Sequence, residues 1–416
     1  MTAPSSALVE NFFRHEYGRL VASLSRQMGM QHLEAVEDAV QTALMAALQT
    51  WTVRGLPDSP SAWLYRVARN EVLTQRRRYA RRDRILSTHQ TTLETSSSSP
   101  PDPTLPNEVS DDLLRMLFVC GHASIPIESQ IVLALKTLCG FSVREVALRL
   151  FTSEANVYKR LERARRQLQK HRSAFDDIGP EQYRARRSAV HRVVYFMFTE
   201  GHLASSGTMA MRQELCHEAI RLGTLVAEQA GDAPETAALL ALMHMHAGRM
   251  SARVDASGGL LLLEEQDRTK WNFDQIQTGF AWLARSASGE VYSRYHAEAA
   301  IAAEHCMATS FEKTRWDKIV EGYDRLEHIA PSALHRLNRA MALAEWRGPS
   351  AGLEALETFE PPAWLTRSYL WSAAMADLNQ RMGRQNEATH YRRSALSRAP
   401  SSAVRRLLER RLSGRE

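Results

Sequence analysis

The chain has 416 residues, of which 44% are hydrophobic and 24% are charged, with a formal net charge of +6. This length predicts two to four domains, and the composition is typical of a soluble globular protein rather than a disordered or membrane-spanning one. The mild positive charge allows a nucleic-acid partner without requiring one. The start, MTAPSSALVENFFRHEYGRL, has no basic segment before an apolar run, so we expect no secretion signal, and no apolar stretch approaches the roughly 18 residues of a membrane span.

The cysteines are widely separated along the chain. They are Cys120, Cys139, Cys216 and Cys306, and no two of them form a C-x-x-C pair. A disulfide framework or a zinc site is therefore not expected, and free thiols in a reducing cytoplasm are the better interpretation.

The first module, residues 1–86, reads as helical. Phe13, Tyr17, Leu20 and Leu24 recur at helical spacing, and a second stripe follows from Val36 to Trp51. Because such spacing continues along the chain and β-branched alternation is scarce, we predict an all-α fold.

A basic cluster closes this module. The segment QRRRYARRDR, 75–84, holds six arginines and follows PSAWLYRVARNEVLT, 60–74, which interleaves aromatic, cationic and amide side chains. Aromatic rings beside cations suit single-stranded bases, because a base can stack on a ring while arginine holds the phosphate. The alternative is equally open: Trp63 lies in the core and the arginines form a solvated face.

Residues 87–109 are rich in Ser, Thr and Pro and predict a flexible linker. A second module, residues 110–175, contains GFSVREVALRLFTS. Ser142 and Glu145 there have the spacing of a capping box, Phe151 and Thr152 form a short turn, and Ser153 can cap the next helix. This pattern predicts a helix-turn-helix.

The second helix of that motif, EANVYKRLERARRQLQK, 154–170, divides into two faces. Val157, Leu161, Ala164 and Leu168 form one apolar side. The candidate DNA-contacting residues lie elsewhere on it: Asn156, Lys159, Arg160, Arg163, Arg165 and Arg166. Asn pairs with adenine edges and Arg or Lys with guanine, whereas the more C-terminal arginines suit phosphates. Such a helix alone is more often a solvated face, but the capped helix and short turn before it favour DNA binding.

The third region, residues 176–416, begins where Gly-Pro interrupts a helix. Toward 316–400 the spacing of Gly383, Ala388, Ala395 and Pro400 is tetratricopeptide-like. The segment 316–332 looks like the second helix of another unit, and 333–357 predicts a further helix pair. Antiparallel helices without true repeats are the alternative.

The segment RVDASGGLLLLEEQD, 253–267, predicts a hairpin. Charges alternate along it and just beyond it, at Arg253, Asp255, Glu264, Asp267 and Arg268. We expect these residues to form a buried or half-buried ionic network that pins the hairpin to helices, in preference to a ligand site.

No catalytic set is recognisable, and we expect no enzymatic activity, no cofactor and no metal. The phosphate-binding G-x-x-x-x-G-K and the nucleophile G-x-S-x-G are both missing from the sequence. His244 and His246 are two residues apart, so on a helix they point to different sides and cannot chelate one metal well.

The two basic modules resemble bacterial sigma factors of the extracytoplasmic-function group. VEDAVQTALMAALQTW, 36–51, looks like the segment that docks on the coiled coil of the polymerase's largest subunit. AWLYRVARNEVLTQRRR, 62–78, looks like the −10 segment, and GFSVREVALRLFTSEANVYKRLERAR, 140–165, looks like the −35-reading helix-turn-helix.

This resemblance implies a role for individual residues. Asp38 and Gln41 would face the polymerase. The melted −10 strand would be lined by Trp63, Arg66, Arg69, Asn70, Arg76 and Arg77, and the −35 duplex would meet the helix 154–170. The family pattern has Glu where this chain has Thr42 and Asp where it has Thr74.

The segments 191–207 and 252–271 look like the C-terminal extension of one subgroup of these sigma factors, which implies a regulatory domain with a protein or peptide partner. The leading interpretation is thus a cytoplasmic sigma factor that directs RNA polymerase core to specific promoters, assists their opening, and is modulated by its C-terminal domain. Two alternatives remain: a stand-alone helix-turn-helix regulator with a helical-repeat sensor domain, and a scaffold whose repeat region is its main functional element.

Overall fold

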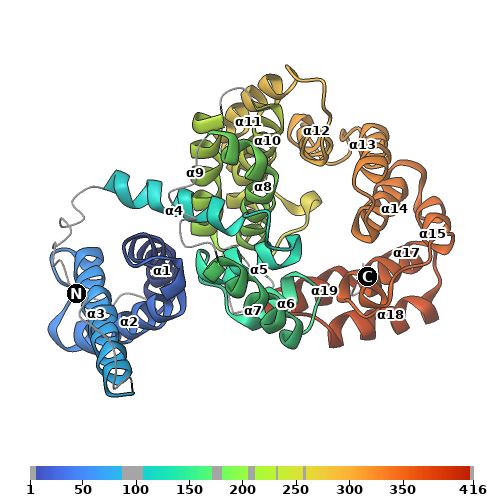
Figure 1. The fold of residues 1–416 in the computed structure, drawn as a ribbon. Helices are drawn as coiled ribbons and strands as arrows, with labels where there is room; N and C mark the ends of the chain where they lie inside the picture. The colour runs from blue at the N-terminus through green and yellow to red at the C-terminus, as the bar shows by residue number, and fades with distance from the viewer. Residues whose placement is uncertain are drawn as a thin grey trace. The chain divides into compact units, whose positions relative to one another are not determined.

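The computed structural model describes residues 6–86, 106–170, 180–204, 211–230, 233–255 and 259–412. These parts of the chain are helical nearly throughout, and the strand pairing within them is one isolated antiparallel bridge between Val254 and Leu260 (Figure 1). The all-α prediction is therefore confirmed. Over the same ranges, no helix combines the length and apolar character that a membrane crossing needs.

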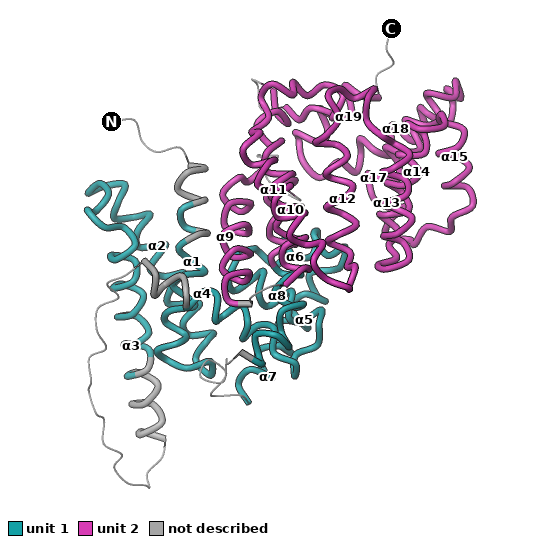
Figure 2. The backbone as a smooth tube through the Cα atoms, turned by 90° about the horizontal axis from the view of Figure 1, so that it is seen from above, with its two compact units in different colours: residues 1–193 teal, residues 194–416 magenta. Residues whose placement is uncertain are grey.

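The chain divides into two compact units, residues 1–193 and residues 194–416 (Figure 2). This boundary lies later than the predicted one at residue 176, because the first half of the helix that begins at Pro180 packs within unit 1. The ring centroids of Tyr183 and Phe118 lie 4.3 Å apart, and Arg186 donates a hydrogen bond to the Phe118 carbonyl at 3.3 Å. Both N-terminal modules belong to the same unit.

Unit 1 contains the following elements: α1 (Ser6–Met28), η1 (Met30–His32), α2 (Leu33–Arg54), α3 (Pro60–Leu86), α4 (Pro106–Cys120), α5 (Ile127–Thr137), α6 (Val143–Arg149), α7 (Glu154–Lys170) and the first part of α8 (Pro180–His202). The predicted stripes of the first two helices are confirmed: Tyr17, Leu20 and Leu24 are buried, as are Val36 and Val40. Of the expected linker, residues 87–105 lie outside the described residues. The prediction was wrong for 106–109, where α4 starts at a proline, a residue well suited to a first helical turn.

The two N-terminal modules pack closely within unit 1. Gly18 of α1 lies against the backbone just after α5, so that a Cβ on Gly18 would stand 2.0 Å from the carbonyl oxygen of Leu138. Arg26 at the end of α1 forms an ion pair of 2.5 Å with Asp112 of α4. The modules are thus joined by backbone contact and by charge.

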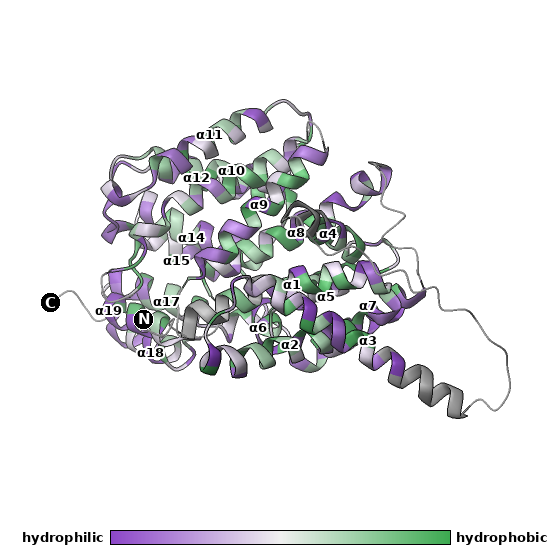
Figure 3. Ribbon diagram, turned by 90° about the vertical axis from the view of Figure 1, so that its left-hand side faces the viewer, coloured by the Kyte–Doolittle hydropathy of each residue, from purple (hydrophilic) through white to green (hydrophobic). Residues whose placement is uncertain are grey.

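Unit 2 contains the rest of α8 and the following elements: α9 (Gln213–Ala230), α10 (Pro234–Gly248), η2 (Met250–Ala252), η3 (Leu263–Glu265), η4 (Arg268–Lys270), α11 (Phe273–Ser286), α12 (Arg294–Met307), α13 (Trp316–Ile329), α14 (Ala333–Arg347), α15 (Pro349–Glu357), α16 (Ala363–Thr366), α17 (Tyr369–Arg381), α18 (Gln385–Ser397) and α19 (Ser402–Leu412). Helix α10 packs against α9, α11 and α12. Its side chains are buried on nearly every side, and it is drawn mostly green in Figure 3. A helix that is apolar all round is expected at the centre of a domain.

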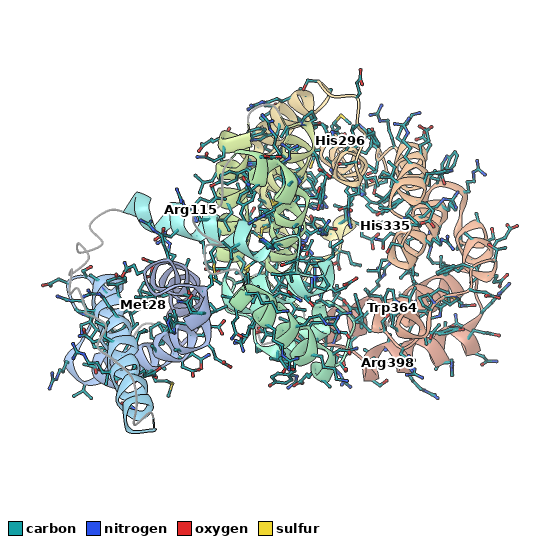
Figure 4. The ribbon with its side chains drawn as sticks, viewed as in Figure 1. Met28, Arg115, His296, His335, Trp364 and Arg398 are labelled. Atoms are coloured by element: carbon teal, nitrogen blue, oxygen red, sulfur yellow. The ribbon has the colours of Figure 1, made fainter. Side chains whose placement is uncertain are left out.

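The C-terminal helices pack in consecutive pairs: α13 with α14, α14 with α15, and α17 with α18. Glycines with positive φ make the tight connections, Gly348 (φ 94°) between α14 and α15 and Gly383 (φ 74°) between α17 and α18. Ala388 and Ala395 are buried on α18, where small side chains let helices approach closely. Arg398, labelled in Figure 4, donates to the Thr366 carbonyl at 2.9 Å and ties the end of α18 to α16.

The predicted hairpin at 253–267 contains the Val254–Leu260 bridge, and its residues 256–258 lie outside the described residues. The expected ionic network was wrong for its arginines: neither Arg253 nor Arg268 forms an ion pair with a carboxylate of the described residues. Local backbone groups compete for the acids, since Asp255 accepts the Gly259 N–H at 2.8 Å.

A different pair pins the hairpin. Arg410 of α19 forms an ion pair of 2.9 Å with Glu265 and donates to the Leu260 carbonyl at 2.5 Å. The hairpin is therefore held against a helix by charge, as expected, but by residues that the sequence pattern did not single out.

Candidate nucleic-acid and polymerase interface

Helices α6 and α7 form the predicted helix-turn-helix. The capping box is present at the start of α6: the Glu145 N–H donates to the Ser142 hydroxyl at 3.2 Å, and the Ser142 N–H donates to the Glu145 carboxylate at 2.8 Å. Phe151 makes the turn with φ 49°, a conformation that non-glycine residues seldom adopt. Ser153 then accepts the Asn156 N–H at 3.3 Å and caps α7.

The two faces of α7 are as the wheel predicted. Val157, Leu161, Ala164 and Leu168 are buried. Asn156, Lys159, Arg163 and Arg166 are exposed, and Arg160 is half-buried. The exposed set defines what we call the cationic face of α7.

The side chains of the cationic face differ in their hydrogen-bond and ion-pair partners. The Asn156 side chain donates to the Thr152 hydroxyl at 3.2 Å, and Arg166 pairs with Glu162 one turn earlier. Lys159 and Arg163 form no ion pair with any described residue. These two side chains therefore remain available to an outside anion such as a phosphate.

Arg165 points away from that face. It forms an ion pair with the buried Glu37 of α2 and lies 3.4 Å from the carboxylate of Glu34. The sequence placed Arg165 among the phosphate contacts, whereas the structure places it between the two N-terminal modules.

The candidate single-strand residues lie on α3. Trp63 is half-buried and its ring meets that of Trp51 edge-on, with centroids 5.6 Å apart. Arg66, Asn70 and Arg77 are exposed and Arg69 is half-buried, while the side chain of Arg76 lies outside the described residues. Trp63 thus belongs to an aromatic cluster with one side still accessible, which combines the two interpretations left open by the sequence.

Thr42 and Thr74, the two residues that differ from the sigma-factor pattern, share one feature. The Thr42 hydroxyl donates to the Asp38 carbonyl at 2.9 Å, and the Thr74 hydroxyl donates to the Asn70 carbonyl at 2.8 Å. Each threonine is therefore satisfied within its own helix, one turn back.

Helix α2 exposes a stripe that sequence reasoning found only in part. Asp38 and Gln41 are exposed, as a docking role requires. Met45 and Leu48, which continue the same side of the helix, are 58% and 41% exposed. Exposed apolar side chains next to polar ones are typical of a protein-binding surface, and their helical spacing from Gln41 was the signal that could have identified them.

The histidines of α10 contact other side chains of unit 2. His244 pairs through Nδ1 with the Gln275 side chain at 2.6 Å, whereas the His246 ring lies 4.8 Å from that of His202. They point to different partners, as predicted. Within the described residues, no group of His, Cys, Asp and Glu is arranged to hold a metal ion.

Comparison with protein families gives three matches along the chain. Residues 13–82 match sigma-70 region 2, residues 115–168 match sigma-70 region 4, and residues 186–287 match a family of unknown function, DUF6596. The first two matches cover the modules predicted from the sequence.

Comparison with individual proteins gives relatives of two kinds. An uncharacterized protein of Rhizobium meliloti, R00370, is 33% identical over 395 residues, which cover 92% of this chain and 91% of the relative. The ECF RNA polymerase sigma factor SigL of Mycobacterium tuberculosis is 34% identical over 133 residues, which cover 32% of this chain and 71% of SigL. No solved structure matches the chain.

Proposed function

The chain belongs to the extracytoplasmic-function group of RNA polymerase sigma factors and directs transcription initiation, and from this premise we propose how its parts divide the work. The protein is a non-catalytic specificity subunit that acts in the cytoplasm, bringing polymerase core to promoters. Unit 1 contacts polymerase and DNA, and unit 2 regulates that activity.

The cationic face of α7 is the part that reads the −35 duplex. This assignment is supported by the division of α7 into a buried apolar stripe and an exposed cationic side, and by the capped helix and tight turn that precede α7. Asn156 and Lys159 lie near the N-terminal end of α7, the end that a recognition helix places against base edges, with Arg160 on the flank. Arg163 and Arg166 lie farther along α7, where they can contact phosphates. The division of α7 into a buried apolar stripe and an exposed cationic side is the single observation that supports the proposal most directly.

The exposed side of α3 meets the melted −10 strand. Arg66 and Asn70, one turn apart and exposed, would hold phosphates and base edges, with Arg69, Arg76 and Arg77 extending the positive surface. Trp63 offers its accessible side for stacking, and its contact with Trp51 fixes the ring in place.

The stripe of α2 docks on the coiled coil of the polymerase's largest subunit. Asp38 and Gln41 supply the polar contacts that the family resemblance assigns, and the exposed Met45 and Leu48 supply apolar area. A pull-down with core polymerase tests this assignment. Met45→Asp with Leu48→Asp should lose core binding, whereas Val53→Asp, at an 84% exposed position near the end of α2, should retain it.

Unit 2 modulates this activity through a protein or peptide partner, with tetratricopeptide-like helix pairs toward 316–400. The tight glycine connections and buried alanines of α14 to α18 support this assignment, since stacked helix pairs commonly present binding surfaces. Arg410→Glu should release α19 from the hairpin and change promoter output while leaving binding to core unchanged. Unchanged output under inducing and non-inducing growth would argue for a passive domain.

A further inference from the structure

Three arginines of unit 2 lie at the C-terminal ends of three helices, and Arg249 interacts electrostatically with both of the others. Arg249 directly follows α10, Arg253 donates to the carbonyl of His202 at the end of α8 at 3.2 Å, and Arg268 donates to the carbonyls of His305 and Ala308 at the end of α12, at 3.0 and 2.5 Å. We call Arg249, Arg253 and Arg268 the arginine cluster. Helix C-termini carry a partial negative charge, which stabilises part of this positive charge.

The arginine cluster lacks the usual partners of buried cations. In the portion of the chain that the structure describes, no carboxylate forms an ion pair with any of the three guanidinium groups. The carboxylate of the exposed Glu312 interacts electrostatically with Arg268 alone of the three. Arg249 is buried and Arg253 and Arg268 are half-buried, and cations removed from water in this way are normally paired. A site with three of them and no ion pair to a described carboxylate therefore needs another source of negative charge.

Burial is the main cause of the lowered pKa values in the arginine cluster, and neighbouring arginines add to it for Arg249 and Arg253. Arg249 is only 8% exposed, and burial together with the charge of Arg268 lowers its pKa. Burial and Arg249 lower the pKa of Arg253 to about 10. Burial and the neighbouring arginines also lower the pKa of His305 to about 3, so this imidazole is neutral near pH 7 and adds a polar group rather than a fourth charge.

Two members of the arginine cluster contact the ring of Trp271. The guanidinium carbons of Arg249 and Arg268 lie 5.2 and 4.5 Å from the centroid of its ring, so the two groups are at most about 10 Å apart. Trp271 is 4% exposed and fixes both cations by cation–π contact. Two of the three positive charges are thus held against one buried aromatic ring.

Several buried polar atoms at this place have no hydrogen-bond partner among the described residues. The buried atoms without a partner among the described residues include Arg249 Nε, Arg268 Nη2 and Trp271 Nε1, and the ring nitrogen Nδ1 of His305. A buried polar group left unpaired is unfavourable, and such groups are scarce in folded proteins. Four of them beside three unpaired cations indicate that a group from outside the chain completes the site.

We propose that the arginine cluster, with Trp271 and His305, binds a small oxyanion of the phosphate class. A tetrahedral dianion accepts several hydrogen bonds at once and matches the forked donors of arginine. Its charge offsets most of the charge of the cluster. The source is either inorganic phosphate or a phosphate monoester, which share this chemistry. Binding is independent of the regulatory role proposed for unit 2, whereas an effect of binding on transcription depends on that role.

The test uses the full chain and inorganic phosphate, with chloride at equal ionic strength as the reference. Calorimetric titration should give saturable binding, and the unfolding temperature should rise with phosphate concentration, because a ligand that binds only the folded state stabilises it. Arg249→Gln and Arg268→Gln should each weaken binding about tenfold or more, as expected for loss of a charged hydrogen bond. Arg315→Gln is the matched control: this exposed arginine pairs with Glu304 of α12 and should leave binding unchanged.

Trp271→Phe keeps the aromatic ring and removes only the Nε1 donor, so it tests the site even if an arginine variant does not fold. It should weaken phosphate binding several-fold. Glycerol phosphate in place of phosphate distinguishes the sources, since tighter binding of the ester indicates a monoester ligand and weaker binding indicates the free ion.

The absence of saturable phosphate binding to the full chain would overturn the proposal, as would unchanged affinity in Arg249→Gln, Arg268→Gln and Trp271→Phe. Phosphate binding that leaves transcription unchanged would leave the site standing and remove its link to regulation by unit 2.

Discussion

Glu37 of α2 and Arg165 of α7 form an ion pair inside unit 1, and the Thr137 hydroxyl donates to the same carboxylate at 2.8 Å. Glu37 is 3% exposed, so this pair lies within the packed contact between the modules. Helix α2, whose exposed stripe we propose as the polymerase-docking surface, is thus joined to the helix with the cationic face.

The Glu37–Arg165 pair should contribute to the stability of unit 1. Arg165→Gln should lower the free energy of unfolding by about 1–3 kcal/mol, because it leaves a buried carboxylate without its cation. Adding Glu37→Gln to that variant should recover part of the loss, since Gln still accepts the Thr137 hydroxyl. Urea unfolding of the two single variants and the double variant measures the coupling. Strictly additive effects would show that the two side chains do not interact.

Gly18→Ala should disturb the contact between the modules. In a helix interior this exchange normally stabilises by about 1 kcal/mol. Here the new Cβ would lie 2.0 Å from the Leu138 carbonyl oxygen, so we expect destabilisation and a more extended chain in small-angle X-ray scattering. Gly223→Ala of α9 is the control, because its Cβ would meet only flexible side-chain atoms at 3.1 Å. Stabilisation by Gly18→Ala without expansion would contradict the packing described for unit 1.

Charge reversal on the cationic face should weaken duplex binding. Lys159→Glu with Arg163→Glu should reduce affinity for promoter duplex at least tenfold, and the logarithmic salt dependence should fall by about one for each phosphate that the protein no longer neutralises. Fluorescence anisotropy over a range of salt concentrations measures both quantities. Arg325→Glu, at an exposed position on α13, makes a matched charge change and should bind as the wild type does. Equal reductions in the two proteins would point to net charge rather than to α7.

The depressed pKa of His305 predicts a pH dependence of stability. The ordinary pKa of 6.5 falls to about 3 in the folded chain because of burial and of Arg249 and Arg268. Between these values the unfolded chain binds a proton that the folded chain does not, so stability falls as pH drops below about 6.5. His305→Phe, which keeps a ring against Trp316, should show a shallower decline between pH 6.5 and 5 in urea unfolding. An identical decline would place the proton uptake at other groups.

Much of the local structure could be predicted because it depends on neighbours in the chain. The Ser142–Glu145 capping box and the stripe from Val157 to Leu168 follow from spacing alone, and both are confirmed. The tetratricopeptide-like spacing of Gly383, Ala388 and Ala395 also predicted paired helices near the C-terminus.

The tertiary partners could not be predicted in the same way. Glu37 and Arg165 are 128 positions apart, and no local pattern marks a buried carboxylate that meets a distant arginine. Arg253 and Arg268 were expected to pair with acids nearby in sequence, but they donate to helix-end carbonyls instead. Charge alternation in a sequence indicates which groups can pair and leaves open which ones lie close together.

Run-off transcription tests the central claim most directly. Purified chain is mixed with core polymerase lacking any other sigma factor and with fragments of the native genome. We predict discrete transcripts that require the chain and that disappear with Lys159→Glu and Arg163→Glu but persist with Arg325→Glu. Absence of specific transcripts from every fragment, together with absence of binding to core polymerase, would contradict the assignment as a promoter-specificity subunit.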